Sequence, residues 1–177
     1  VHMGKKINLS YDEAINNMII SLKYVINMLD KNDGYVLLEN SAGEGTALYT
    51  IEDMGKVYQG LTGEEQTKIK FVIDTCHSYT AGYDLCNKTQ QKKFIKLLEQ
   101  HLKIENISCL HLNDSYENLN SKKDRHQNLM LGYLSGRDSR SNTFFTFVKY
   151  ILSHNIPLIL ETDPCLHIAE IQLLKNL

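Results

Sequence analysis

The sequence predicts an α/β fold of the (β/α)8 TIM-barrel class, because short apolar segments alternate with amphipathic ones and end on the same kinds of side chain. The predicted strands are residues 34–39, 69–74, 107–111 and 156–161, which end on Glu39, Asp74, His111 and Glu161. His2 closes the stub of a fifth strand. From His2 onward, these end residues follow one another at intervals of 37, 35, 37 and 50 residues, so the first three steps match one strand-helix-strand unit each.

The strand ends predict a metal centre. The carboxyl ends of parallel barrel strands converge on one face, where side chains far apart in sequence meet. A carboxylate at a single strand end is more often a helix cap or a loop anchor. Four ligand-type side chains at matched positions favour a cation, because burying several unpaired charges together is costly. A mixed His and carboxylate set made of Glu39, Asp74, His111 and Glu161 suits Zn²⁺ or Mn²⁺.

The length of the chain suggests a part of a barrel. With 177 residues and 42% hydrophobic content, the chain has enough apolar side chains to form one hydrophobic core. A complete eight-unit barrel needs about 250 residues, and the sequence opens on Val1 inside an apparent strand end. We therefore expect residues 1–177 to be the C-terminal part of a single metal-dependent barrel domain, holding strands 4–8, with three N-terminal β-α units missing and the barrel incomplete.

The helical segments fit between these strands in order. A capping box at Ser10–Glu13 precedes apolar residues at helical spacing that continue to Leu29, and this helix should end near residues 32–34. A shorter helix begins at residues 50–53 and runs toward Gly60. Amphipathic stretches follow at residues 92–102 and 142–154, and Asp163 and Pro164 predict the start of a last helix.

Composition excludes some classes of protein. No segment approaches the ~18 consecutive apolar residues of a membrane span, and the N-terminus has no apolar signal region, so we expect a soluble intracellular protein of the cytoplasm or nucleus. The four cysteines form no C-x-x-C pair and are predicted to be reduced and mostly buried, with Cys76 unligated. The net charge of −2 gives no general argument for nucleic-acid binding.

The lengthened step between His111 and Glu161 holds a polar insertion, at residues 113–126, of the kind that often carries function. It contains Asp124 and His126, and His77 lies three residues beyond a strand end. A D-x-H pair in a polar loop usually lies exposed on the surface and binds no metal. Together with the strand-end ligands, however, His77, Asp124 and His126 could hold a further metal.

Two further features are consistent with phosphate contact. The loop at residues 40–45 contains glycines that permit tight turns beside a ligand. Five cations surround the inserted loop, although a solvated loop explains them equally well. They are Lys122, Lys123, Arg125, Arg137 and Arg140.

These segments resemble the endonuclease IV family of apurinic/apyrimidinic endonucleases. The resemblance covers nearly the whole chain in a series of motifs in the same order. The motifs are Leu38-Glu-Asn-Ser-Ala-Gly-Glu-Gly45, Asp74-Thr-Cys-His-Ser-Tyr-Thr-Ala-Gly-Tyr-Asp84, His111-Leu-Asn-Asp114, Lys123-Asp-Arg-His126 and Pro157-Leu-Ile-Leu-Glu-Thr162. The family's glycine-rich run after the Asp-Arg-His motif has fewer glycines here, between Leu129 and Gly136.

The resemblance implies a zinc-dependent DNA-repair enzyme that hydrolyses the DNA backbone 5′ to abasic sites by a metal-activated hydroxide. It implies three Zn²⁺ ions per intact chain, with Mn²⁺ as an alternative, and a monomer acting on double-stranded DNA. His2 and Glu39 would serve the first metal, and Glu39 would bridge to a second held with Asp74, His111 and Glu161. His77, Asp124 and His126 would hold the third. Glu161 and Glu39 are the expected catalytic residues, since they position metal and water.

Two alternatives stay open. Xylose-isomerase-like sugar isomerases and epimerases share the barrel and a Glu, Asp, His, Glu metal set, so they would need only Glu39, Asp74, His111 and Glu161 and one or two divalent metals. Asp124 and His126, with His77, argue against them. The other alternative is an inactive truncated product that keeps ligands without activity.

Overall fold

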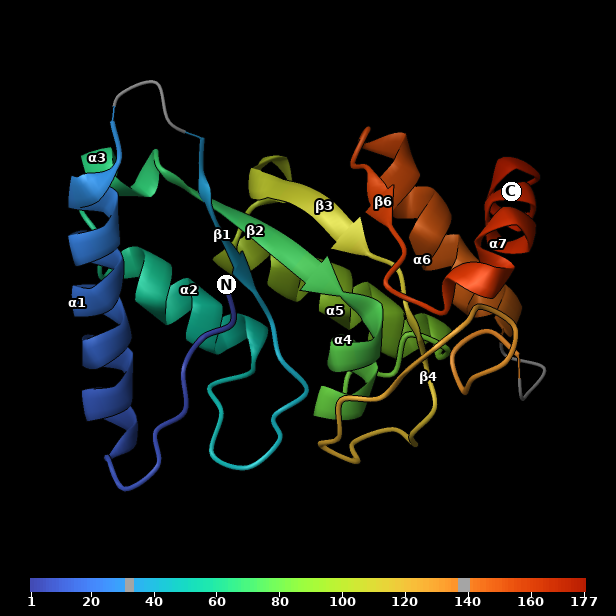
Figure 1. Cartoon of the computed structure of the whole chain (residues 1–177), viewed down its shortest axis with the longest axis horizontal. Coiled ribbons are helices and arrows are strands. Elements are labelled where there is room, and N and C mark those ends of the chain that lie inside the picture. The colour runs from blue at the N-terminus through green and yellow to red at the C-terminus, as the bar shows by residue number, and fades with distance from the viewer. Residues whose placement is uncertain (31–33, 137–140) are drawn as a thin grey trace.

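A four-stranded parallel sheet forms the centre of the computed structural model, which describes residues 1–30, 34–136 and 141–177. The strands lie side by side in the order in which they occur along the chain (Figure 1). They are β1 (Val36–Glu39), β2 (Ile69–Asp74), β3 (Ile107–His111) and β6 (Leu158–Ile159). His2 forms an isolated parallel bridge to Glu39, so the N-terminal stub lies beside β1. The predicted parallel α/β sheet is thereby confirmed.

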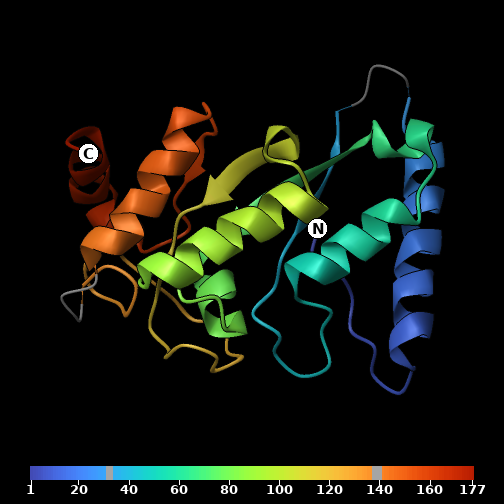
Figure 2. The same ribbon diagram turned by 180° about the vertical axis from the view of Figure 1, so that it is seen from behind.

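The described residues also form seven α-helices. They are α1 (Tyr11–Met28), α2 (Ile51–Gln59), α3 (Gly63–Gln66), α4 (Thr75–Ala81), α5 (Lys88–His101), α6 (Ser141–Ser153) and α7 (His167–Lys175), with 3-10 turns at Ile104–Asn106 and Pro164–Leu166. In Figure 1, α2 and α5 lie behind the sheet, and in Figure 2 they lie in front of it. Among the described residues, no helix combines the length and apolar character needed to cross a membrane.

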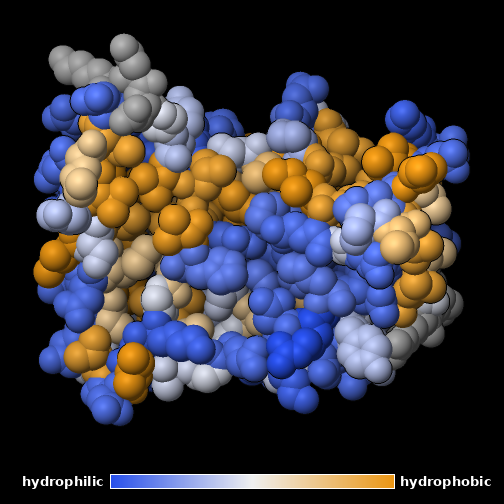
Figure 3. All heavy atoms as spheres, viewed as in Figure 1, coloured by the Kyte–Doolittle hydropathy of each residue, from blue (hydrophilic) through white to orange (hydrophobic). Residues whose placement is uncertain are grey.

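The opposite sheet face divides into two zones. Figure 3 shows apolar side chains gathered over the upper part of this face and hydrophilic side chains below them, toward the ends of the strands. On β2, Phe71 and Ile73 are fully buried in the hydrophobic core, where the Phe71 ring packs edge-on against Tyr58. The next residue, Asp74, points to the other face because side chains alternate along a strand. The hydrophilic zone therefore lies where the strand-end ligands were predicted.

Several predicted elements match the structure. The capping box of α1 is present, with the Ser10 side chain accepting from the Glu13 N–H and the Glu13 carboxylate accepting from the Ser10 N–H. Helix α1 ends at Met28, earlier than predicted, and residues 32 and 33 of the expected end lie outside the described part of the chain. All four cysteines are free, and only Cys165 is exposed.

The last strand differs from its prediction. Residues 156–161 were expected to form a strand ending on Glu161, but β6 covers only Leu158–Ile159, and Glu161 lies two residues beyond it. Among the described strands, β6 pairs with β3 alone, and Pro157 can offer only its carbonyl to the ladder, accepting from the Leu110 N–H at 2.9 Å. Glu161 is held by a side chain instead, as its N–H donates to Asn113 Oδ1 at 2.9 Å.

Other elements were missed or displaced. Helix α4 follows β2 directly, with the Asp74 side chain as its N-cap, but all seven of its residues are buried and show no apolar periodicity. Helix α5 begins at Lys88 because Asn87 caps it. Asp163 and Pro164 begin a 3-10 turn, and α7 starts later, at His167. The polar insertion contains two short antiparallel strands, β4 (Asp114–Ser115) and β5 (His126–Gln127).

Asp114 organises the inserted segment. Its carboxylate is fully buried and accepts from the backbone N–H groups of Gly132, Leu134 and Ser135 at 3.1, 2.7 and 3.1 Å, and from the Ser135 hydroxyl at 2.5 Å. A Cβ added to Gly132 would lie 2.3 Å from Asp114 Oδ1, so only glycine allows this approach. One side chain thus supplies the acceptor for three backbone N–H groups of a loop without regular structure.

The fold predicts a large stability loss for Asp114→Ala. Four buried N–H groups, those of Ser115, Gly132, Leu134 and Ser135, would lose their acceptor, at about 1–3 kcal/mol each, so the melting temperature should fall by roughly 8 °C or more. Differential scanning calorimetry checks this, with Glu99→Ala on the exposed side of α5 as the control, for which a change within about 0.5 kcal/mol is expected. Equal melting temperatures for the two variants would contradict the role given to Asp114.

Candidate metal centre

Four of the predicted ligands meet at the carboxyl ends of the strands. Glu39, Asp74, His111 and Glu161 each offer one ligand atom, and these atoms all lie within 4.8 Å of one another. Asp74 and His111 are direct partners in the β2–β3 register. His111 Nδ1 lies 2.9 Å from Glu39 Oε1 and 3.0 Å from Glu161 Oε2. We call this set the four-ligand group.

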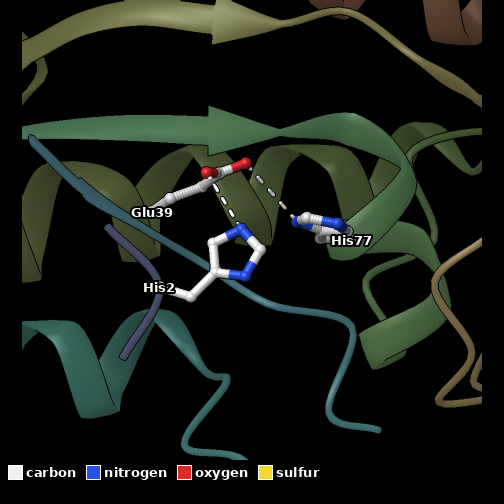
Figure 4. A group of neighbouring side chains, drawn as sticks. All are labelled: His2, Glu39 and His77. Carbon is white, nitrogen blue, oxygen red and sulfur yellow. Dashed lines mark ion pairs between the residues drawn. The ribbon is translucent and has the colours of Figure 1, made fainter. Parts of the chain in front are cut away.

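Glu39 also belongs to a second group, with His2 and His77. Its carboxylate lies between the two imidazoles, with Oε2 3.0 Å from His2 Nε2 and Oε1 3.6 Å from His77 Nδ1 (Figure 4). The parallel bridge between His2 and Glu39 fixes this approach through the backbone. Glu39 therefore stands between two sets of ligands, the position that the resemblance requires of a bridging carboxylate.

A third group joins α4 to the inserted segment. Asp124 Oδ2 lies 3.1 Å from His77 Nε2, and Asp124 Oδ1 lies 3.2 Å from His126 Nε2. Because Asp74 caps α4, accepting from the His77 N–H at 2.7 Å, the first helical turn carries His77 next to the strand ends. We call His77, Asp124 and His126 the three-ligand group. Cys76 also lies near Asp74 and His126, and it is buried.

Two asparagines that the sequence reasoning missed hold the ligands in place. Asn113 donates from Nδ2 to Asp74 Oδ2 at 2.7 Å and to Glu161 Oε2 at 3.1 Å. Asn40 accepts from the Asp74 N–H at 2.8 Å, and its carbonyl oxygen lies 3.0 Å from His77 Nδ1. Both asparagines are fully buried. The only signal in the sequence is their nearness to ligands, since Asn40 follows Glu39 and Asn113 is two residues past His111.

Burial and charge set opposing pKa shifts in this cluster. Burial raises the pKa of Glu39, but hydrogen bonds and charge attraction from His111 and His2 outweigh it and leave the pKa well below its usual range. Burial dominates at Asp74 and raises its pKa despite nearby His77 and His126. Burial lowers the pKa of His77, but Asp124, Asp74 and Glu39 raise it to about 9. A proton on His77 thus offsets part of the carboxylate charge.

The donor chemistry fits divalent cations. The imidazole nitrogens and carboxylate oxygens of the three groups are the ligands that Zn²⁺ and Mn²⁺ accept, and the buried carboxylates need positive charge whether protons or a metal supply it. Asn113 and Asn40 orient the ligands in the way that hydrogen-bonding partners around metal sites do.

A cavity of about 350 Å³ opens beside these groups, lined by His2, Asp124, Lys5 and Ser41 among others. The glycine loop on its rim makes the tight turns expected of it, with φ of +87° at Gly43. A small organic or nucleotide group could enter this space next to the ligands.

The predicted cations near the site already have protein partners. Lys122 Nζ donates to the Ala81 carbonyl at 2.6 Å and lies 4.2 Å from the centre of the Tyr49 ring. Arg125 lies 3.6 Å from Glu44, and Lys123 lies 3.7 Å from Glu117. Arg137 and Arg140 lie outside the described residues. Phosphate contact by these side chains stays a prediction.

Known proteins match this chain over most of its length. The family model described as "Xylose isomerase-like TIM barrel" matches residues 1–176. A putative endonuclease 4 of Acanthamoeba polyphaga mimivirus is 35% identical over 166 residues, which cover 92% of this chain and 51% of that protein. A probable endonuclease 4 of Thermosipho melanesiensis is 32% identical over 163 residues, covering 92% of this chain and 54% of that protein.

The solved structures give the same fold. The crystal structure of endonuclease IV from Thermus thermophilus superposes with a TM-score of 0.75 at 22% identity, covering 99% of this chain and 59% of that one. The chain spans about half the length of the curated relatives named above.

The three groups predict a metal count. Elemental analysis of protein equilibrated with Zn²⁺ should find close to three ions per chain, and His126→Ala should lower this by about one because it breaks only the three-ligand group. His154→Ala, an exposed histidine just after α6, should leave the count unchanged. A firm value of one that is unaffected by His126→Ala would favour the sugar isomerase alternative.

Proposed function

Because the chain belongs to the xylose isomerase-like TIM barrel family, we propose that it is part of a metal-dependent DNA-repair endonuclease that hydrolyses the phosphodiester 5′ to abasic sites. The relatives named endonuclease 4, which match it over 92% of its length, support this substrate class. The observation that carries the proposal is the three-ligand group, with Asp124 within 3.2 Å of both His77 and His126. A sugar isomerase using one or two metals has no need of it.

The proposal includes the place of this chain in a barrel. The stub at His2 and the four parallel strands would be strands 4–8 of eight, and residues 1–177 the C-terminal part of a single endonuclease domain whose three N-terminal β-α units lie elsewhere in the protein. The sequential order of the strands and the 51–60% of the relatives' lengths that the chain covers support this placement.

The ligand groups would hold three Zn²⁺ ions, with Mn²⁺ as the alternative. His2 and Glu39 would serve the first, the four-ligand group the second and the three-ligand group the third, with Glu39 shared. Bound cations would supply Lewis acidity that lowers the pKa of water and neutralises charge on the phosphate. A mixed set of imidazole and carboxylate donors at each group supports zinc over calcium or magnesium.

The chain's own residues would position the reactants. Glu39 and Glu161 both lie within 3.0 Å of His111 Nδ1, so the three side chains would fix the reaction centre together. Asn113 keeps Asp74 and Glu161 in register through one side-chain amide. The cavity beside His2 and Asp124 would receive the abasic sugar once it leaves the duplex. No side-chain nucleophile is needed.

The partner would be double-stranded DNA with an abasic site, bound by a monomer, since the described ligand groups are built within one chain. A DNA substrate places the protein in the cytoplasm or nucleus. Light scattering of the purified protein tests the monomer, and a mass of twice the chain's or more would reject it.

The proposal predicts that Glu161→Gln keeps DNA binding but loses DNA cleavage. The amide keeps the shape of the side chain but loses the charge that attracts a cation, so abasic-DNA binding should stay within a few-fold while incision falls by several orders of magnitude. A gel assay of nicking and fluorescence anisotropy of binding measure the two effects. Glu105→Gln is the matched control, because Glu105 is exposed and distant from the ligand groups along β3.

Two outcomes would count against the assignment. Incision by Glu161→Gln at a near wild-type rate would remove Glu161 from the mechanism. Conversion of an aldose to a ketose by the wild-type protein, without incision of abasic DNA, would replace the nuclease by the isomerase.

A further inference from the structure

Helix α7 buries a carboxylate. Glu170 is 3% exposed, and it is the one buried residue of this helix. No basic side chain in the described ranges forms an ion pair with it. An ionisable group in such a position is costly unless hydrogen bonds compensate it, and an apolar residue of similar size would pack there without that cost. The hydrogen-bond partners of this carboxylate therefore indicate its role.

Three donors surround Glu170. Oε1 accepts from the Leu129 N–H at 2.7 Å, and Oε2 accepts from Asn128 Nδ2 at 3.1 Å and from the Thr162 hydroxyl at 2.8 Å. Asn128 is itself buried and also donates to the Asp163 carbonyl at 3.0 Å. These bonds cross-link two segments, residues 128–129 and residues 162–163, that are more than 30 positions apart in the sequence.

Each of these segments lies close in the sequence to a ligand, and the two ligands belong to different groups. Thr162 directly follows Glu161 of the four-ligand group, and Asn128 lies two residues after His126 of the three-ligand group. Glu161 extends from a short strand with a single described neighbour, and His126 from a two-residue strand, so regular structure restrains neither ligand strongly. Asn113 holds Glu161 through two hydrogen bonds, and the hydrogen bonds of Glu170 add a restraint between the segment of Glu161 and the segment of His126.

We propose that Glu170 is a positioning residue, which sets Glu161 and His126 relative to each other and so holds the four-ligand and three-ligand groups at a fixed separation. This inference rests on the proposed metal-dependent function. Side chains that orient metal ligands through hydrogen bonds typically change metal affinity about 10- to 100-fold when they are replaced. Glu170 would act through the backbone of the segments that carry Glu161 and His126, rather than through a hydrogen bond to a ligand side chain.

Co²⁺ binding tests this proposal, because its visible absorption reports ligand geometry whereas Zn²⁺ is spectroscopically silent. Glu170→Met removes all three hydrogen bonds while filling the space, and it should weaken Co²⁺ binding about 10-fold or more and change the visible spectrum. Glu170→Gln should restore part of the affinity, since its carbonyl oxygen can still accept from the Leu129 N–H. Thr162→Val, a milder change, should alter the spectrum in the same direction even if Glu170→Met folds poorly.

Gln91→Met is the matched control. Gln91 is also buried, and its Nε2 donates to the Leu85 and Thr143 carbonyls at 2.9 and 2.7 Å, which joins two segments that carry no ligand. It should lower the melting temperature of the metal-free protein but leave the Co²⁺ affinity within about twofold and the spectrum unchanged. In nicking assays, Glu170→Met should lower kcat more than it raises KM, because the DNA-binding surface is kept.

The outcomes separate the two proposals. If Glu170→Met and Thr162→Val bind Co²⁺ with wild-type affinity and spectrum, the positioning role is wrong and Glu170 is purely structural, whatever the enzyme cleaves. If the variants weaken Co²⁺ binding as expected but the whole wild-type protein, with its N-terminal β-α units, does not nick abasic DNA, the proposed function fails and the positioning role stands. A wild-type protein that binds no Co²⁺ would overturn both.

Discussion

Carboxylates gathered at the ends of parallel strands impose the main constraint on this molecule. Glu39 and Asp74 are buried at neighbouring strand ends, and Glu161 and Asp124 approach the same place from loops. Negative charges this close repel one another strongly unless positive charge lies among them, above all at Glu39 and Asp74, which are shielded from water. Four histidines lie among these carboxylates: His2, His77, His111 and His126 each lie within 3.2 Å of a carboxylate oxygen. The same pairs are the ligands that divalent cations would use.

The protein also restrains the ligands by hydrogen bonds with buried residues that are not themselves ligands. Asn40 and Asn113 reach across from neighbouring segments and contact Asp74 from two sides, through its backbone N–H and its carboxylate. Asp114, next in sequence to Asn113, fixes the loop that follows β5. Ligands from six separate segments therefore belong to one connected network, in which the displacement of one segment would move several ligands. The positions of the ligand side chains therefore depend on buried hydrogen bonds as much as on the pairing of the strands.

The sequence predicted the strands that have neighbours on both sides. The bounds of β2 and β3 match the expected residues, because apolar runs of this length bounded by polar ones fit a buried parallel strand. Strand β6 is shorter than expected because its pairing is one-sided among the described residues. Helix α4 was missed because it is buried on all sides and lacks the period of a half-exposed helix. The ligand residues were named from their strand-end positions, and the structure brings them together, whereas Asn113 and Glu170 matter through contacts between distant segments that no local pattern encodes.

X-ray anomalous scattering from crystals grown with Zn²⁺ tests the central claim most directly, since it locates each bound ion against the side chains around it. Our account predicts three peaks: one enclosed by Glu39, Asp74, His111 and Glu161, one by His77, Asp124 and His126, and one beside His2 and Glu39. A single peak in the four-ligand group, with His77 and His126 still paired only to carboxylates, would contradict it. That result would leave the barrel and its buried charges explained but would remove the basis for a three-metal endonuclease.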